Sequence, residues 1–296
     1  MSQIIEVFKH HCLSINARMK MNNLIEEISS CNGESDGIKS LYKLLDDIVI
    51  NDVNNKFRLK LEPGTKYFRA RIIDPSDYDK PEKGIGIRKD GKLCGYNEAN
   101  SREPILGLST VGRNNVAGAS YLYLASNPET ACIEIKPQLG ELISVATFEL
   151  NSPLYIIDFS SEQFFENELS ALYNMSLDVF FTELMFRYSM PVTDSADYRA
   201  SQVISDYLRK TGVDGIKYRS FLSLGGCNYT IFNCHRSKIK FCESKVVIYK
   251  QANHSFWDLN EKNEIMTNRE GVSLIYDDKT AIEHLEDLKK YFKSVE

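Results

Sequence analysis

Residues 112–137 read GRNNVAGASYLYLASNPETACIEIKP, and the predicted fold and site depend on this stretch. The apolar and aromatic side chains of residues 120–125 are typical of a half-buried strand. A turn follows in which Ser126 or Asn127 can cap a helix, and this short helix carries Glu134 among small and apolar residues. On this stretch alone the favoured interpretation of Glu134 is an exposed helical glutamate. Whether it has a functional role depends on the other residues of the chain.

Length and composition suit either one large globular domain or one domain with extensions. The chain has 296 residues, of which 43% are hydrophobic and 26% charged, as is ordinary for globular proteins. No apolar run approaches the roughly 18–20 residues of a membrane span, and the N-terminus lacks the apolar core of a signal peptide. The seven cysteines are scattered, which favours reduced thiols. We therefore expect a cytoplasmic protein without membrane contact.

Several common enzyme motifs are absent from the sequence. There is no P-loop, no HExxH zinc motif and no GxSxG nucleophile elbow. Neither the histidines nor the cysteines have metal-ligand spacing, so no metal site is expected. A net charge of −5 argues against direct binding of nucleic acid, but it allows a small anionic ligand held by a few arginines.

Periodicity predicts an α+β fold in three parts. Residues 1–60 predict a small helical region that packs on the main domain, forms a homo-oligomer or receives a partner. Residues 61–250 mix strands and helices without a steady βαβ repeat, and residues 251–296 predict an extension that ends in a helix. The predicted strands are residues 66–73, 120–125, 142–150, 154–159, 215–219, 228–232 and 241–249. The predicted helices are residues 3–30, about 37–50, roughly 161–189, a helix capped by Asp194 and stopped by Gly212, and 280–293.

Candidate binding residues lie on or after the predicted strands. Strand alternation puts Arg69 and Arg71 on one face. Tyr123 lies on the strand before Glu134, and Ser220 ends the strand at 215–219. Each also has a plain structural interpretation, namely an exposed strand charge, a core tyrosine or a turn serine.

Taken in order, these residues resemble the RES-domain family, which is named for its Arg, Glu and Ser. The resemblance covers roughly residues 67–249. It rests on Phe68-Arg69, on Arg113-Asn114-Asn115 through Gly118, on Leu122-Tyr123-Leu124-Ala125 through Ala131-Cys132-Ile133-Glu134, and on the segment from Val213 to Ser220. Asn114 departs from the pattern, since the family usually has an aromatic residue there.

The resemblance implies an ADP-ribosyltransferase-like core of mixed and antiparallel sheets with flanking helices. It implies a toxin of a toxin–antitoxin pair that cleaves the nicotinamide–ribose bond of NAD⁺ by hydrolysis or phosphorolysis. NAD⁺ is then a substrate, and no cofactor is expected. An Xre-type antitoxin is the implied partner. Two alternatives stay open: an ADP-ribosyltransferase that modifies a protein or nucleic acid, and an inactive RES-like binding module.

The implied chemistry needs a carboxylate and a cation. The transition state is oxocarbenium-like, so a fixed carboxylate near the ribose stabilises it, and the resemblance implies this role for Glu134. A guanidinium can hold the pyrophosphate in two-pronged fashion. Arg69 is the first choice, with Arg71 and Arg113 as helpers, and whether Arg69 or Arg71 is the family arginine stays open.

Two further side chains complete the implied site. Tyr123 can offer its ring face to nicotinamide and its hydroxyl to a ribose or phosphate. Ser220 can donate to the ribose or phosphate, or orient Glu134.

Overall fold

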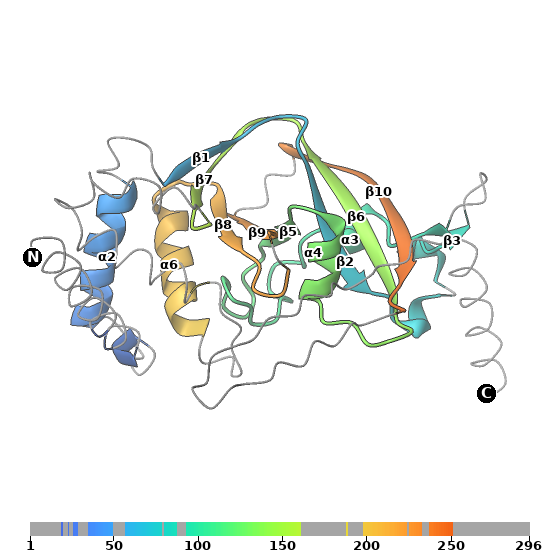
Figure 1. Cartoon of the computed structure of the whole chain (residues 1–296), viewed down its shortest axis with the longest axis horizontal. Coiled ribbons are helices and arrows are strands. Elements are labelled where there is room, and N and C mark those ends of the chain that lie inside the picture. The colour runs from blue at the N-terminus through green and yellow to red at the C-terminus, as the bar shows by residue number, and fades with distance from the viewer. Residues whose placement is uncertain are drawn as a thin grey trace, which may run out of the picture. The chain divides into compact units, whose positions relative to one another are not determined.

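The structure is a computed structural model, and it combines helices with a mixed sheet, which confirms the predicted α+β class (Figure 1). It describes residues 19, 23, 26–28, 35–49, 57–78, 80–87, 93–160, 188, 198–223, 225–232 and 237–250. The chain divides into two compact units. Unit 1 consists of Met1–Thr65, Glu103–Ser126 and Leu150–Lys240, and unit 2 consists of Lys66–Arg102, Asn127–Glu149 and Phe241–Glu296. The three-part division at residues 60 and 250 stays a prediction.

Unit 1 contains five strands of mixed direction. Their order is β1-β7-β8-β9-β5, where β7 and β8 are parallel and the other neighbours are antiparallel. Two parallel neighbours require a crossover between them, and the chain between β7 and β8 includes helix α6 (Arg199–Lys210). The strands are β1 (Arg58–Leu61), β5 (Leu122–Ala125), β7 (Leu154–Asp158), β8 (Gly215–Arg219) and β9 (Cys227–Ile231).

Two helices of unit 1 pack against each other (Figure 1). Helix α2 spans Asp36–Val49, as the helical spacing of about 37–50 predicted, and α6 spans Arg199–Lys210. The rings of Tyr42 and Tyr207 stack between them with centroids 4.5 Å apart. Gly212 ends the α6 segment with φ of 86°, the left-handed conformation predicted for it. The buried side chains include Leu41, Leu45, Val203, Ile204, Leu208 and Phe232.

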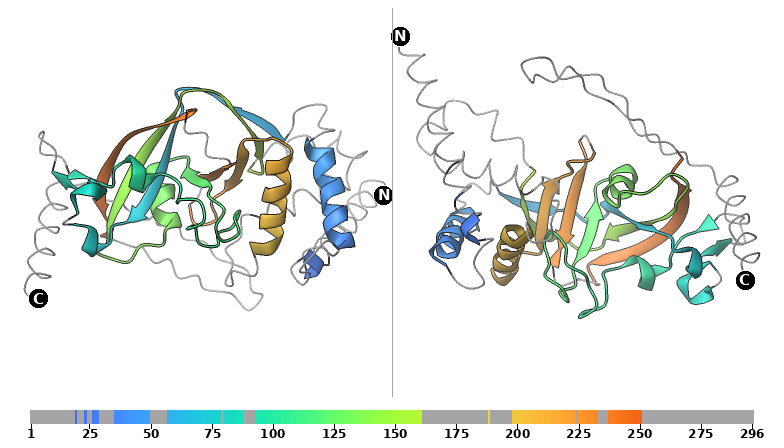
Figure 2. Two further views of the ribbon diagram at one scale, coloured as in Figure 1. Left: turned by 180° about the vertical axis from the view of Figure 1, so that it is seen from behind. Right: turned by 90° about the horizontal axis from the view of Figure 1, so that it is seen from below.

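Unit 2 is built on three strands in the order β2-β6-β10. Strands β2 (Lys66–Ile72) and β6 (Leu142–Leu150) are antiparallel, and β10 spans Ile239–Ile248. Helices α4 (Pro128–Glu134) and α3 (Glu98–Ser101) both contact β2. Figure 2 shows these two helices on opposite sides of the three strands.

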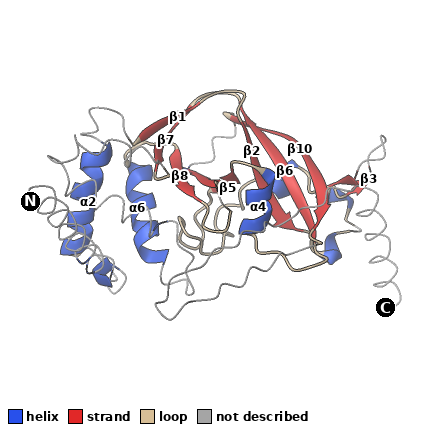
Figure 3. Ribbon diagram, viewed as in Figure 1, coloured by secondary structure: helices blue, strands red, loops and turns tan. Residues whose placement is uncertain are grey.

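Residues 74–110, for which the sequence predicted neither a helix nor a strand, contain short elements. They are the 3-10 turns η1 (Pro75–Asp77) and η2 (Pro81–Lys83), the paired strands β3 (Gly86–Ile87) and β4 (Leu93–Cys94), and α3. Figure 3 labels β3 among them. Tyr78, Leu93 and Tyr96 of this segment join a core with Ile73, Leu142 and Val246.

Several predicted helices fall wholly or partly outside the described residues. Of the predicted helix at 3–30, Met19, Asn23 and 26–28 are described, and they are helical. Only Tyr188 is described from 161–189, and both the Asp194 cap and the helix at 280–293 lie outside. None of the described helices has the length and apolar character needed to cross a bilayer.

Candidate functional site

Arg69 and Arg71 share one face of β2. Arg69 lies opposite Ala146 of β6 and Arg71 lies opposite Ser144, in an uninterrupted antiparallel register. Arg71 Nη2 donates a 2.8 Å hydrogen bond to the carbonyl oxygen of Arg102, the residue that follows α3. Burial lowers the pKa of Arg71. Arg71 is therefore tied to the α3 side of the strands.

Glu134 is the last residue of α4, and it is half-buried. The helix forms as the sequence predicted: the side chain of Asn127 accepts from the N–H of Thr130 at 2.7 Å, and Pro128 takes the first turn. Burial raises the pKa of Cys132 to about 12, so the one thiol on this helix is protonated at neutral pH.

The structure brings some of the unit 2 candidates together and separates others. Arg69 and Arg71 lie on one face of β2, and the bond from Arg71 to Arg102 makes this the α3 face. Helix α4, which carries Glu134, contacts β2 from the opposite side (Figure 2). A direct pairing of Arg69 with Glu134 stays a prediction.

The segment Gly112–Gly118, which we call the arginine loop, belongs to unit 1. Its conformation is set by the hydroxyl of Tyr123, which donates to Asn115 Oδ1 at 2.7 Å and accepts from the N–H of Asn114 at 3.1 Å. Asn115 Nδ2 donates to the carbonyl oxygens of Thr110 and Val116 at 2.8 and 3.0 Å. The predicted NAD⁺ contact Tyr123 thus already uses its hydroxyl within the fold.

Arg113 is held by aromatic residues of unit 1. Its Nη1 donates to the carbonyl oxygen of Tyr188. Its guanidinium lies 5.5 Å from the ring centre of Tyr198 and 5.8 Å from that of Tyr218, within reach of a cation–π attraction. These contacts fix Arg113 in unit 1.

Asn114, where the family usually has an aromatic residue, is 1% exposed and hydrogen-bonded on both sides. Its Nδ2 donates to Thr230 Oγ1, and its Oδ1 accepts from the hydroxyl of Tyr188. Burial raises the pKa of Tyr188 well above its ordinary value, so this hydroxyl stays a donor. Asn114 is therefore part of a buried polar network.

Helix α6 holds the other side of the arginine loop. Gln202 Nε2 donates to the carbonyl oxygens of Gly112 and Asn115 at 3.0 and 3.2 Å, and Ser201 Oγ donates to that of Arg113 at 2.5 Å. The sequence reasoning missed these two residues. Their signal was two adjacent polar residues beside the apolar stripe of a helix.

Ser220 follows β8 and closes a turn. Its N–H donates to the carbonyl oxygen of Gly226, and its Oγ accepts from the N–H of Ser223, both at 2.9 Å. Arg113, Tyr123 and Ser220 belong to unit 1, whereas Arg69, Arg71 and Glu134 belong to unit 2. The joint site of all six stays a prediction.

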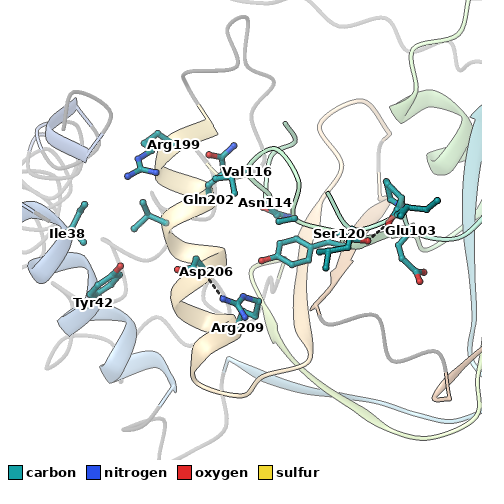
Figure 4. Close-up of a pocket in the computed structure, with 16 residues that line it drawn as sticks. Ile38, Tyr42, Glu103, Asn114, Val116, Ser120, Arg199, Gln202, Asp206 and Arg209 are labelled. Carbon is teal, nitrogen blue, oxygen red and sulfur yellow. Dashed lines mark hydrogen bonds and ion pairs between the residues drawn. The ribbon is translucent and has the colours of Figure 1, made fainter. Parts of the chain in front are cut away.

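A cavity of about 840 Å³ lies within unit 1, between α2, α6 and residues 103–121 (Figure 4). The described residues that line it include none of the six predicted site residues. In the part of the chain that the structure describes, no group of three or more His, Cys, Asp or Glu side chains could hold a metal ion. The lining residues are Ile38, Tyr42, Glu103, Pro104, Ile105, Leu106, Asn114, Val116, Ala119, Ser120, Tyr121, Arg199, Gln202, Val203, Asp206 and Arg209.

Comparison with known proteins gives one family. The RES domain matches residues 95–249, which is more than half of the chain. The matched range includes Arg113, Tyr123, Glu134 and Ser220, and it begins after Arg69 and Arg71. No curated protein matches the chain.

Among solved structures, the chain is similar to one from the crystal structure of the M. tuberculosis MbcT–MbcA toxin–antitoxin complex. The two are 13% identical, the similarity covers 71% of this chain and 93% of that chain, and the TM-score is 0.37.

Proposed function

Because the chain belongs to the RES-domain family, we propose that it is an enzyme that consumes NAD⁺ by cleaving the bond between nicotinamide and ribose. Water or phosphate accepts the ADP-ribosyl group. The observation that carries the proposal is Glu134: a half-buried carboxylate that ends a capped helix directly after a strand, inside the residues that match the family.

The proposed chemistry follows from the charge that develops on the substrate. Nicotinamide leaves readily, and positive charge grows on the ribose. A carboxylate held by a short helix stabilises that charge without having to reorganise. The residues before Glu134 on this helix, which are Thr130, Ala131 and Cys132, are small and buried, and burial raises the pKa of the Cys132 thiol to about 12.

The arginines divide between binding and support in this proposal. Arg69 is the candidate to hold the pyrophosphate, because a guanidinium matches the geometry of phosphate oxygens. Its joint action with Glu134, whose helix contacts β2 from the opposite side, stays a prediction. Arg71 and Arg113 already donate to main-chain carbonyl oxygens, so they support β2 and the arginine loop. The half-buried side chain of Tyr123 holds the arginine loop through its hydroxyl. Contact of Tyr123 and Ser220 with the substrate stays a prediction.

The decisive experiment is to incubate the purified full chain with NAD⁺ and to measure nicotinamide release with and without phosphate. We expect release by the native chain and none by Glu134→Gln. The matched control is Glu129→Gln, which removes an exposed carboxylate from the first turn of the same helix and should retain activity. Absence of release at high enzyme concentration contradicts the proposal.

The same experiment identifies which molecule accepts the ADP-ribosyl group. Free ADP-ribose indicates hydrolysis, and a phosphorylated ADP-ribose that appears only with phosphate indicates phosphorolysis. If the mass of ADP-ribose is added to a macromolecule and little free product forms, the chain is instead an ADP-ribosyltransferase. If NAD⁺ is unchanged and the chain forms a stable complex with another protein, the chain is instead a binding module.

As a toxin, the chain should arrest growth by draining NAD⁺, and an Xre-type antitoxin should relieve the arrest. Expression of the native chain should lower cellular NAD⁺ before growth stops, whereas Glu134→Gln should leave both unchanged. Arrest by Glu134→Gln at equal expression would count against NAD⁺ depletion as the cause.

A further inference from the structure

The cavity of unit 1 has one wall that lies outside the family match. Ile38 and Tyr42 of α2 form this wall, and α2 precedes residues 95–249. The opposite wall is α6, with Val203 of its buried face, and residues 103–121 close the third side. The N-terminal helical region therefore supplies one wall of the cavity.

Most of the residues that line the cavity are apolar, and several apolar side chains at its rim are exposed to solvent. The exposed fraction is 72% for Ile105, 78% for Leu106 and 48% for Val116, and all three line the cavity. The loop that holds them is ordered by a 2.9 Å bond from Gly107 N–H to the carbonyl oxygen of Gly118. Apolar side chains held at an open rim favour an occupant with an apolar body.

The charged groups of α6 are not equivalent. Asp206 accepts from Arg209 at 2.8 Å and from Lys210 at 2.6 Å, so its charge is balanced on the helix itself. Arg199 also lines the cavity, and its guanidinium makes no hydrogen bond or ion pair with another described residue. Figure 4 shows its head group extended from α6 toward α2, away from the pair of Asp206 and Arg209.

We infer that this cavity binds a small amphipathic molecule with an apolar body and one anionic head, and that Arg199 receives the head. A volume of about 840 Å³ suits a small molecule, since such sites commonly occupy roughly 300–1,000 Å³. A guanidinium binds a carboxylate or a phosphate through paired N–H groups. The inference does not rest on NAD⁺ cleavage.

The test compares probes that share one apolar body. Decanoate and decanol differ only in the head, and both can be titrated into the full chain by calorimetry. We expect one site per chain, about tenfold tighter for decanoate than for decanol. Decyl phosphate distinguishes the sources of the head: tighter binding than decanoate assigns a phosphate ligand, and weaker binding assigns a carboxylate. Inorganic phosphate alone should not bind detectably.

Two kinds of variant locate the site. Arg199→Gln should abolish the preference for decanoate over decanol, whereas Arg58→Gln, which removes an exposed arginine from β1 of the same unit, should keep it. Val203→Trp and Ala119→Trp fill the cavity from α6 and from the loop respectively. Either variant, if it folds, should no longer bind decanoate or decanol.

Three results would overturn the inference. They are equal affinity for decanoate and decanol in the native chain, a preference for decanoate that survives Arg199→Gln, and unchanged binding by a folded filling variant. Loss of nicotinamide release bears on the proposed function alone, because these titrations contain no NAD⁺.

Discussion

The hydroxyl of Tyr123 donates a 2.7 Å hydrogen bond to Oδ1 of Asn115. It also accepts from the N–H of Asn114, so one side chain of β5 fixes the two residues that follow Arg113. A strand residue predicted to contact substrate is thus the support of the arginine loop.

Tyr123→Phe should lower the free energy of unfolding by about 1–2 kcal/mol, because it leaves two partly buried polar groups without their partner. It should also slow nicotinamide release if the arginine loop serves the reaction. Urea unfolding and the nicotinamide assay measure the two effects. Tyr155→Phe is the control, since Tyr155 is 55% exposed on β7. Equal stability of the two variants would remove the supporting role of the hydroxyl.

Gly112→Ala should disturb the same network from the backbone. A Cβ at Gly112 would lie 2.5 Å from Asn115 Oδ1 and 3.0 Å from the Tyr123 hydroxyl oxygen. We expect a loss of about 1–3 kcal/mol in unfolding free energy. The loss should be less than additive with Tyr123→Phe, because both changes break one network. Gly86→Ala is the control, since its Cβ would meet nothing within 4 Å.

Substitutions of the two arginines of β2 should have different effects. Arg71→Ala removes a bond from a half-buried guanidinium to the Arg102 carbonyl oxygen, so unfolding free energy should fall by about 1–3 kcal/mol. Arg69→Ala should instead raise the KM for NAD⁺ at least tenfold, as expected of the residue that holds the pyrophosphate. The opposite pattern, with Arg71→Ala altering KM and Arg69→Ala altering stability only, assigns the family arginine to Arg71.

Docking of α2 on α6 should contribute strongly to the stability of unit 1. Leu45 is 0% exposed in the core that also contains Ile204 and Leu208. Leu45→Ala should cost about 2–5 kcal/mol, as other large-to-small core changes do. Lys43→Ala, an exposed change on the same helix, should stay within about 0.5 kcal/mol. Equal unfolding curves for the two variants would show that α2 does not stay docked in solution.

Local sequence patterns predicted the elements that carry the candidate residues. The strand at β2, the strand at β5 and the capped helix α4 each follow from a few neighbouring residues. The structure chooses Asn127 over Ser126 as the cap, because Asn127 accepts from Thr130 N–H. Gly212 likewise ends its helical segment with the predicted positive φ.

Long-range partners could not be predicted in the same way. The carbonyl oxygen that accepts from Arg113 belongs to Tyr188, which lies 75 positions along the chain. Gln202 reaches Gly112 across 90 positions. Sequence alternation predicted that Arg69 and Arg71 share a face, but it could not show which helix covers that face. Tertiary packing decides these contacts, and no local spacing encodes them.

Asp77 anchors the segment after β2, and its stability effect should depend on pH. Its carboxylate pairs with Lys80 at 2.9 Å and Lys83 at 3.8 Å, and it accepts from the Tyr96 hydroxyl at 2.9 Å. Burial alone raises the pKa of Asp77, but the bonds from Lys80 and Tyr96 and the charge of Lys83 outweigh it and leave the pKa lowered. A lowered pKa stabilises the fold above the unfolded value of about 4, and the stabilisation is lost as pH falls through the folded value.

Asp77→Asn should therefore lower unfolding free energy by about 1–3 kcal/mol at pH 7, and the gap to the native chain should narrow below about pH 4. Urea unfolding from pH 7 to pH 3 measures this. Asp36→Asn, whose side chain is 97% exposed, should stay within about 0.5 kcal/mol of the native chain throughout. If the Asp77→Asn gap stays constant across this range, the ionised carboxylate does not anchor the segment.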